Sequence, residues 1–76
     1  MMQKIHWRQI EIFHAIMTRG NLTQAAEFLH TSQPTLSREL ARFEQQLSVS
    51  LFSRVRGRLQ PTVQGLRLFE EVERSW

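Results

Sequence analysis

Two amphipathic segments in the middle of this chain are joined by very few residues. The first ends at Leu29 and the second begins at Gln33, which leaves only His30, Thr31 and Ser32 for the connection. A turn of this length forces the two helices that these segments predict to cross closely, as a helix-turn-helix. This constraint governs how the rest of the chain can fold.

The second segment carries a full set of helix signals. Ser32 is a good N-cap, and Pro34 suits a first turn in which its missing N–H is no loss. Leu36, Leu40 and Phe43 recur at helical spacing, so one stripe of the helix is expected to be buried.

The opposite face of this predicted helix is polar from its first residue. Amides and hydroxyls pair with base edges, and guanidiniums bind phosphates or guanine. This composition is typical of a recognition helix that contacts DNA. The residues predicted to do so are Ser32, Gln33, Pro34, Thr35, Ser37, Arg38 and Arg42. Arg42 has an alternative, because Glu39 or Glu44 could hold it in a surface ion pair.

Two helices are predicted before this one. Ile10, Phe13, Ile16 and Met17 indicate an amphipathic helix over residues 7–18, ended by Gly20. Asn21, with Gln24 three residues later, indicates the cap of a second helix. The inward face of that helix is expected to consist of Leu22, Ala25, Ala26 and Leu29.

A β-hairpin is predicted over residues 51–60. Two short apolar and basic segments flank Arg56 and Gly57, a dipeptide that favours a tight turn. Arg54, Arg56 and Arg58 are expected to contact the DNA backbone, although they could also be a solvated turn that protects an edge strand. A hairpin beside a recognition helix is a wing.

The last segment, residues 63–76, predicts another amphipathic helix, which Thr62 can cap. Its apolar seam extends well beyond what a three-helix core needs, so we expect this helix to be a linker that pairs with a second copy. The residues predicted at this dimer interface are Leu66, Phe69, Val72 and Trp76. The fold class is therefore mainly α: a winged helix-turn-helix, with a three-helix core and a β-hairpin wing, followed by a linker helix.

Composition narrows the possible functions. The 76 residues suffice for one small domain, and the net charge of +3 is concentrated in residues 31–60. No stretch is long and apolar enough to cross a membrane, so a soluble, cytoplasmic protein without a membrane partner is expected.

An enzyme is disfavoured by the same composition. The chain has no Asp, no Cys and no glycine-rich phosphate loop. His6, His14 and His30 have no spacing that suits a metal site, and they are interpreted as surface or turn residues. No catalytic residue, metal or cofactor is therefore predicted.

The order of motifs resembles the DNA-binding domain of LysR-type transcriptional regulators. The similarity covers roughly residues 5–66, and its most specific parts are Ser32–Arg38, with Ser-Gln-Pro followed by Ser-Arg, and Leu51–Arg54. It implies that residues 1–62 form a winged helix-turn-helix, with the helix-turn-helix at 22–41 and the wing at 51–60, and that residues 63–76 form a linker helix.

The resemblance also implies partners. In the family, residues matching the start of the recognition helix meet the major groove of double-stranded DNA at a dyad site, and a wing arginine approaches phosphate or the minor groove. It implies a homodimer through the linker helix, a higher oligomer in the full-length protein, and a small-molecule effector bound by a domain absent from this chain. Two positions depart from the usual glycine of such proteins: His30 in the turn and Ser48 after the third helix.

A second class of function stays open, because winged helices also serve as protein-interaction or assembly modules, and the last helix offers an apolar face. The arginine-rich wing and the uncharged polar start of the recognition helix favour DNA over this alternative.

Overall fold

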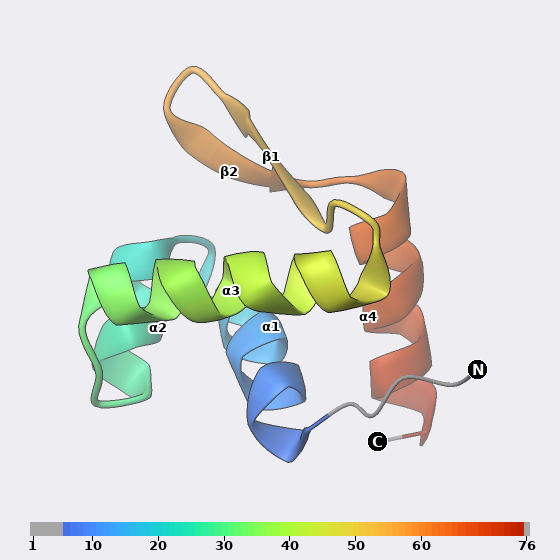
Figure 1. Cartoon of the computed structure of the whole chain (residues 1–76), viewed down its shortest axis with the longest axis horizontal. Helices are drawn as coiled ribbons and strands as arrows, with labels where there is room; N and C mark the ends of the chain where they lie inside the picture. Colours follow the sequence, from blue (N-terminus) through green and yellow to red (C-terminus); the bar gives the residue numbers. More distant parts are fainter. Residues whose placement is uncertain (1–5, 76) are drawn as a thin grey trace.

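The computed structural model describes residues 6–75, so the predicted role of Trp76 lies outside the described residues. The elements follow in the order α1 (Trp7–Arg19), α2 (Leu22–Phe28), α3 (Gln33–Leu47), β1 (Phe52–Val55), β2 (Arg58–Pro61) and α4 (Val63–Ser75) (Figure 1). This confirms the predicted mainly α fold with a β-hairpin wing.

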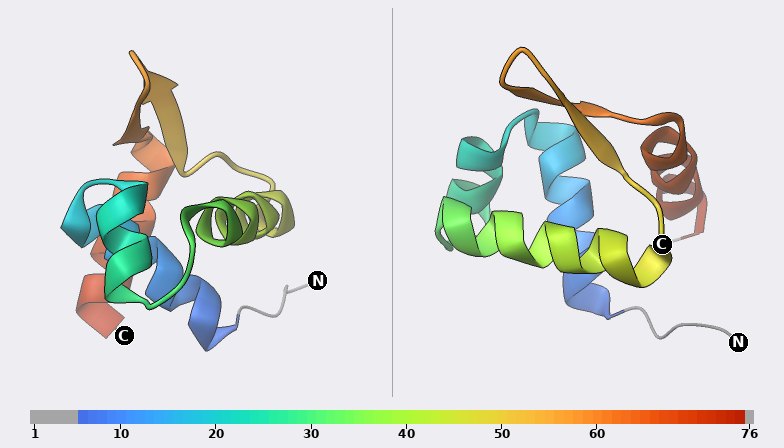
Figure 2. Two further views of the ribbon diagram at one scale, coloured as in Figure 1. Left: turned by 90° about the vertical axis from the view of Figure 1, so that its left-hand side faces the viewer. Right: turned by 45° about the horizontal axis from the view of Figure 1, so that its top comes forward.

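The core lies where α1, α2 and α3 cross. Its largest fully buried side chains include Phe13 of α1 and both Leu36 and Phe43 of α3. Ala25 and Ala26 of α2 are buried as well, so that small side chains allow the two helices of the helix-turn-helix to approach closely. Figure 2 shows α2 and α3 on either side of the short turn, with α1 behind them.

The helix ends form as the local sequence predicts. Gly20 closes α1 in the left-handed conformation, at φ 92°. Asn21 caps α2 by accepting the Gln24 N–H, and Ser32 caps α3 by accepting the Thr35 N–H. His30, in the turn where glycine is common, has φ 58°, a region that His tolerates better than most residues with a side chain.

The wing is a two-stranded antiparallel hairpin in which Arg54 pairs with Leu59 and Val55 with Arg58. Arg56 and Gly57 form the turn, both with positive φ (54° and 77°), as a tight hairpin turn requires. The strands begin and end one residue later than predicted, because Leu51 is buried in the core instead of joining the hairpin.

Helix α4 begins at Val63 and runs beside α1 (Figures 1 and 2). Thr62 Oγ1 caps it by accepting the N–H of Gly65 at 3.1 Å. A methyl group added at Gly65 would overlap the carbonyl oxygen of Leu51, so glycine lets the helix approach the start of the wing. Val72 of this helix is only 7% exposed and belongs to the hydrophobic core, so the protein's own core covers part of the predicted apolar seam.

One polar residue of α1 is buried. Gln9 lies between the apolar positions of this helix, yet it is only 6% exposed. Its side-chain oxygen Oε1 accepts the His6 backbone N–H at 3.1 Å, and its side-chain NH2 donates to Gln46 Oε1 near the end of α3. A polar residue can be buried when it is hydrogen-bonded in this way. No helix within residues 6–75 is long and apolar enough to cross a membrane.

Candidate DNA-binding surface

The first turn of α3 uses part of its polar set for its own structure. Ser32 Oγ accepts the Thr35 N–H at 3.2 Å and donates its proton to Thr35 Oγ1 at 2.9 Å. Thr35 keeps its own hydroxyl proton for an outside acceptor. Ser32 therefore shapes the site more than it offers a free donor.

Gln33 and Pro34 are exposed at the tip of this turn. The side chain of Gln33 has a neighbour that the sequence did not point to, because Thr23 Oγ1 of α2 lies 3.5 Å from Gln33 Oε1. The two residues are ten positions apart and meet only because α2 and α3 cross. Helical spacing alone could not have indicated this contact.

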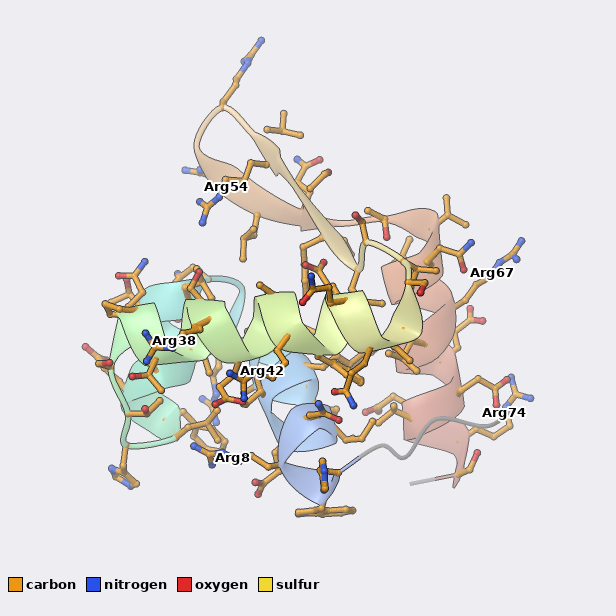
Figure 3. The ribbon with its side chains drawn as sticks, viewed as in Figure 1. Arg8, Arg38, Arg42, Arg54, Arg67 and Arg74 are labelled. Atoms are coloured by element: carbon orange, nitrogen blue, oxygen red, sulfur yellow. The ribbon has the colours of Figure 1, made fainter. Side chains whose placement is uncertain are left out.

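Arg38 and Arg42 are exposed one helical turn apart on α3, on the side turned to the viewer in Figure 3, and Ser37 beside them is half-buried. Within residues 6–75, neither arginine forms an ion pair. The predicted alternative partner Glu44 is engaged elsewhere, since its carboxylate accepts the N–H groups of Leu51 and Phe52. Both guanidiniums are therefore available to an outside anion.

The wing adds three exposed arginines, Arg54, Arg56 and Arg58, none of which forms an ion pair in the described part of the chain. Arg54 lies opposite Leu59, which packs against the core, so both side chains are on the inner face of the hairpin. Figure 3 shows Arg54 between the wing and the first turn of α3, whereas Arg67 and Arg74 project from α4 on the far side.

Between the wing and the helix-turn-helix lies a polar hollow of about 490 Å³, which we call the wing hollow. Residues of the α1–α2 turn, of α2, of α3 and of both strands line it. They are Gly20, Asn21, Leu22, Thr23, Gln33, Arg54, Gly57, Arg58, Leu59 and Gln60. The lining holds two guanidiniums and no carboxylate, so it suits an anion.

The residues predicted at a dimer interface fall into different environments. Val72 faces its own core, and Phe69 is half-buried with its ring stacked 5.5 Å from that of His14. Leu66 is 49% exposed, and Val63 one turn earlier is 63% exposed. An apolar strip therefore remains on the first half of α4, narrower than the predicted seam.

One of the three histidines, His14, connects two helices. His14 Nε2 lies 2.6 Å from Glu73 Oε2, and the two residues are 59 positions apart, so the contact joins α1 to α4. His14 was interpreted as a plain surface residue, and this contact shows that it also holds α4. Residues 6–75 contain no group of His, Cys, Asp or Glu side chains that could hold a metal ion.

Comparison with known proteins gives the family. Residues 7–66 match the family described as "Bacterial regulatory helix-turn-helix protein, lysR family". The chain belongs to the lysR family. It is 71% identical over 75 residues to the Transcriptional activator protein LysR of Escherichia coli (strain K12), and this match covers 99% of the chain and 24% of that protein. The identity confirms the closeness to the family's namesake that residues 54–59 and 63–71 indicate.

Solved structures agree with this assignment. The chain matches the CbnR DNA-binding domain, in a crystal structure with DNA, with a TM-score of 0.84 at 33% identity, covering 92% of this chain and 80% of that one. It matches the BenM DNA-binding domain, in a complex with catB site 1 DNA, with a TM-score of 0.85 at 26% identity, covering 92% and 79%.

The chain is therefore a lysR-type helix-turn-helix DNA-binding domain, and its relatives are transcriptional regulators, not enzymes. It spans about a quarter (24%) of the length of the E. coli LysR protein.

Proposed function

We propose that this lysR-type domain binds double-stranded DNA sequence-specifically, as a symmetric dimer on a dyad site. The first two turns of α3 enter the major groove, and the wing lies on the backbone or in the minor groove. The observation that carries the proposal is the exposure of Arg38, Arg42 and Arg54 on α3 and the wing, without carboxylate partners among residues 6–75.

The residues divide by chemistry. Arg38, Arg42 and the wing arginines 54, 56 and 58 supply attraction to phosphates, which is independent of sequence and weakened by salt. Gln33, Pro34, Thr35 and Ser37 lie where the helix meets base edges, so they supply discrimination between sequences. Ser32 supports them as the helix cap.

The dimer is proposed to form through α4, as a linker helix comprising residues 63–76, next to a winged helix-turn-helix unit of residues 1–62. The exposed Leu66 and the partly exposed Phe69 favour this, while Val72 supports α4 from inside its own chain. We propose that the full-length protein forms a higher oligomer and binds a small-molecule effector through a further domain. Similarity to the E. coli activator favours activation of transcription, in the cytoplasm, where bacterial DNA lies.

The experiment that tests this function is DNA binding at two salt concentrations. A dyad-symmetric duplex is compared with a scrambled duplex of equal length and composition, and the number of chains per duplex is measured in the same samples. Two chains per dyad, with a preference that survives added salt, support the proposal. Equal binding to both duplexes that vanishes with salt would contradict it and favour the protein-interaction alternative.

A further inference from the structure

The wing hollow brings together residues from parts of the chain that the recognition helix alone does not include. Arg54 comes from the inner face of β1, Thr23 from the first turn of α2 and Gln33 from the start of α3. Arg58 and Gln60 line the same space. Two guanidiniums without an acidic neighbour favour a ligand with at least one negative charge.

The position of the hollow selects the kind of anion. It opens between the two elements that the proposed function places on DNA, so a strand that runs from the recognition helix to the wing passes over it. The hollow is polar and about 490 Å³ in volume, which accommodates a tetrahedral phosphate with its waters. A phosphodiester of that strand therefore fits both its charge and its size.

Thr23 gives the hollow a donor that also touches the base-reading residue. A threonine hydroxyl has one proton, and in the free domain this proton is donated to Gln33 Oε1 at 3.5 Å. A phosphate oxygen in the hollow would be the stronger acceptor, because hydrogen bonds to charged groups are stronger than neutral ones. Donation to the phosphate would release the Gln33 amide from its orientation toward Thr23, so that it can turn to pair with adenine through its oxygen and its NH2.

We propose that the wing hollow binds one backbone phosphate of the bound duplex, held by Arg54 and by the hydroxyl of Thr23, and that this phosphate frees Gln33 from Thr23 to read a base. The inference rests on the proposed function and deepens it by adding a residue of α2 to the DNA-binding set. Asn21 also lines the hollow, but its side-chain oxygen already caps α2, so it is not assigned a phosphate contact.

The test uses duplexes in which single phosphates are replaced by neutral methylphosphonates. The parent duplex is selected from a random-sequence pool by this chain. At one phosphate per half-site, the unmodified protein is expected to lose about tenfold in affinity, which is the size of one charge-assisted contact. The Thr23→Val and Arg54→Ala variants should bind the parent duplex more weakly than the unmodified protein does. Their affinity should fall little further when that phosphate is replaced by the methylphosphonate.

Two comparisons make the result specific. Thr23→Ser keeps the hydroxyl and should restore the response to the methylphosphonate. Thr18→Val, a change at an exposed threonine of α1 that does not line the hollow, should leave the whole scan as it is in the unmodified protein. In addition, Gln33→Ala should cost less affinity on the duplex with the neutral phosphate than on the parent duplex, because Gln33 is not released there.

One result would overturn the inference. If the Thr23→Val variant loses as much affinity as the unmodified protein at every methylphosphonate position, Thr23 holds no phosphate. Failure of the pool to enrich any sequence would instead count against the proposed function, so the two failures are distinguishable.

Discussion

The carboxylate of Glu44 fixes the entry to the wing: its Oε2 lies 2.7 Å from the backbone nitrogen of Leu51. The same oxygen accepts the N–H of Phe52 at 3.1 Å. Because Glu44 belongs to α3, these two bonds set the direction of the wing relative to the recognition helix. The arginines of the wing depend on this setting for their position beside α3.

Removal of the Glu44 carboxylate should therefore destabilise the domain. Glu44→Ala leaves two partly buried N–H groups without an acceptor and is expected to lower the free energy of unfolding by about 2–3 kcal/mol. Glu44→Gln keeps an acceptor oxygen and should cost about 1 kcal/mol. Urea unfolding measures both. Gln45→Ala, at the exposed neighbouring position, is the control, and a loss as large as that of Glu44→Ala would contradict the assigned role.

Gln33 and Arg54 should affect DNA binding in different ways. Gln33→Ala is expected to cost roughly 1–3 kcal/mol at the selected site and little on unrelated DNA, because it removes a base contact. Arg54→Ala should weaken binding to all sequences and reduce the slope of log K against log salt by about one, because it removes a phosphate contact. Titrations of both duplexes over a salt series check this. Equal losses on specific and unrelated DNA for both variants would refute the division of roles.

The helix caps and the hairpin turn could be predicted from the sequence. The caps at Asn21 and Ser32, the left-handed Gly20 and the turn at Arg56 and Gly57 were predicted because each depends on neighbours within a few residues. Local conformational preferences suffice for such features.

Contacts between distant residues were missed for the opposite reason. Gln9 and Gln46 are 37 positions apart, and His14 and Glu73 are 59 apart, so neither pair has a periodic signature. Val72 was assigned to a dimer seam because a helical stripe looks the same whether its own chain or a second copy covers it. The Thr23–Gln33 contact belongs to this group, which is why the DNA-contact set from sequence lacked a residue of α2.

Val72 and Leu66 should separate folding from dimerisation. Val72→Ala removes two methyl groups from the core and should lower the free energy of unfolding by roughly 1–2 kcal/mol. Leu66→Ala, at a 49% exposed position, should leave unfolding of the monomer nearly unchanged but weaken self-association. Thermal unfolding at low concentration and sedimentation over a concentration series measure the two effects. If Leu66→Ala left self-association unchanged, Leu66 would not be at the interface.

Gly65 should tolerate no side chain. In Gly65→Ala the new methyl group would meet the Leu51 carbonyl oxygen, which is backbone and cannot rotate away. We expect a loss of about 1–3 kcal/mol, the usual range for overpacking, with a displaced α4. Gln64→Ala, at an exposed position on the same helix, is the matched control. Thermal unfolding of both variants measures this loss. Equal melting temperatures would contradict the prediction, because they would show that α4 moves to accommodate the methyl group without loss of stability.

Ser48 should be improved by glycine. It ends α3 at φ 60° and ψ 31°, a left-handed conformation in which a Cβ atom is strained. Its backbone N–H donates to the Gln45 carbonyl at 3.2 Å, and glycine keeps this bond. Ser48→Gly should therefore raise the free energy of unfolding by about 0.5–1 kcal/mol, after the greater freedom of glycine in the unfolded chain is subtracted. Ser48→Ala keeps the Cβ and should give no gain. If alanine stabilised the domain as much as glycine, the serine hydroxyl and not the backbone conformation would be the source of the strain.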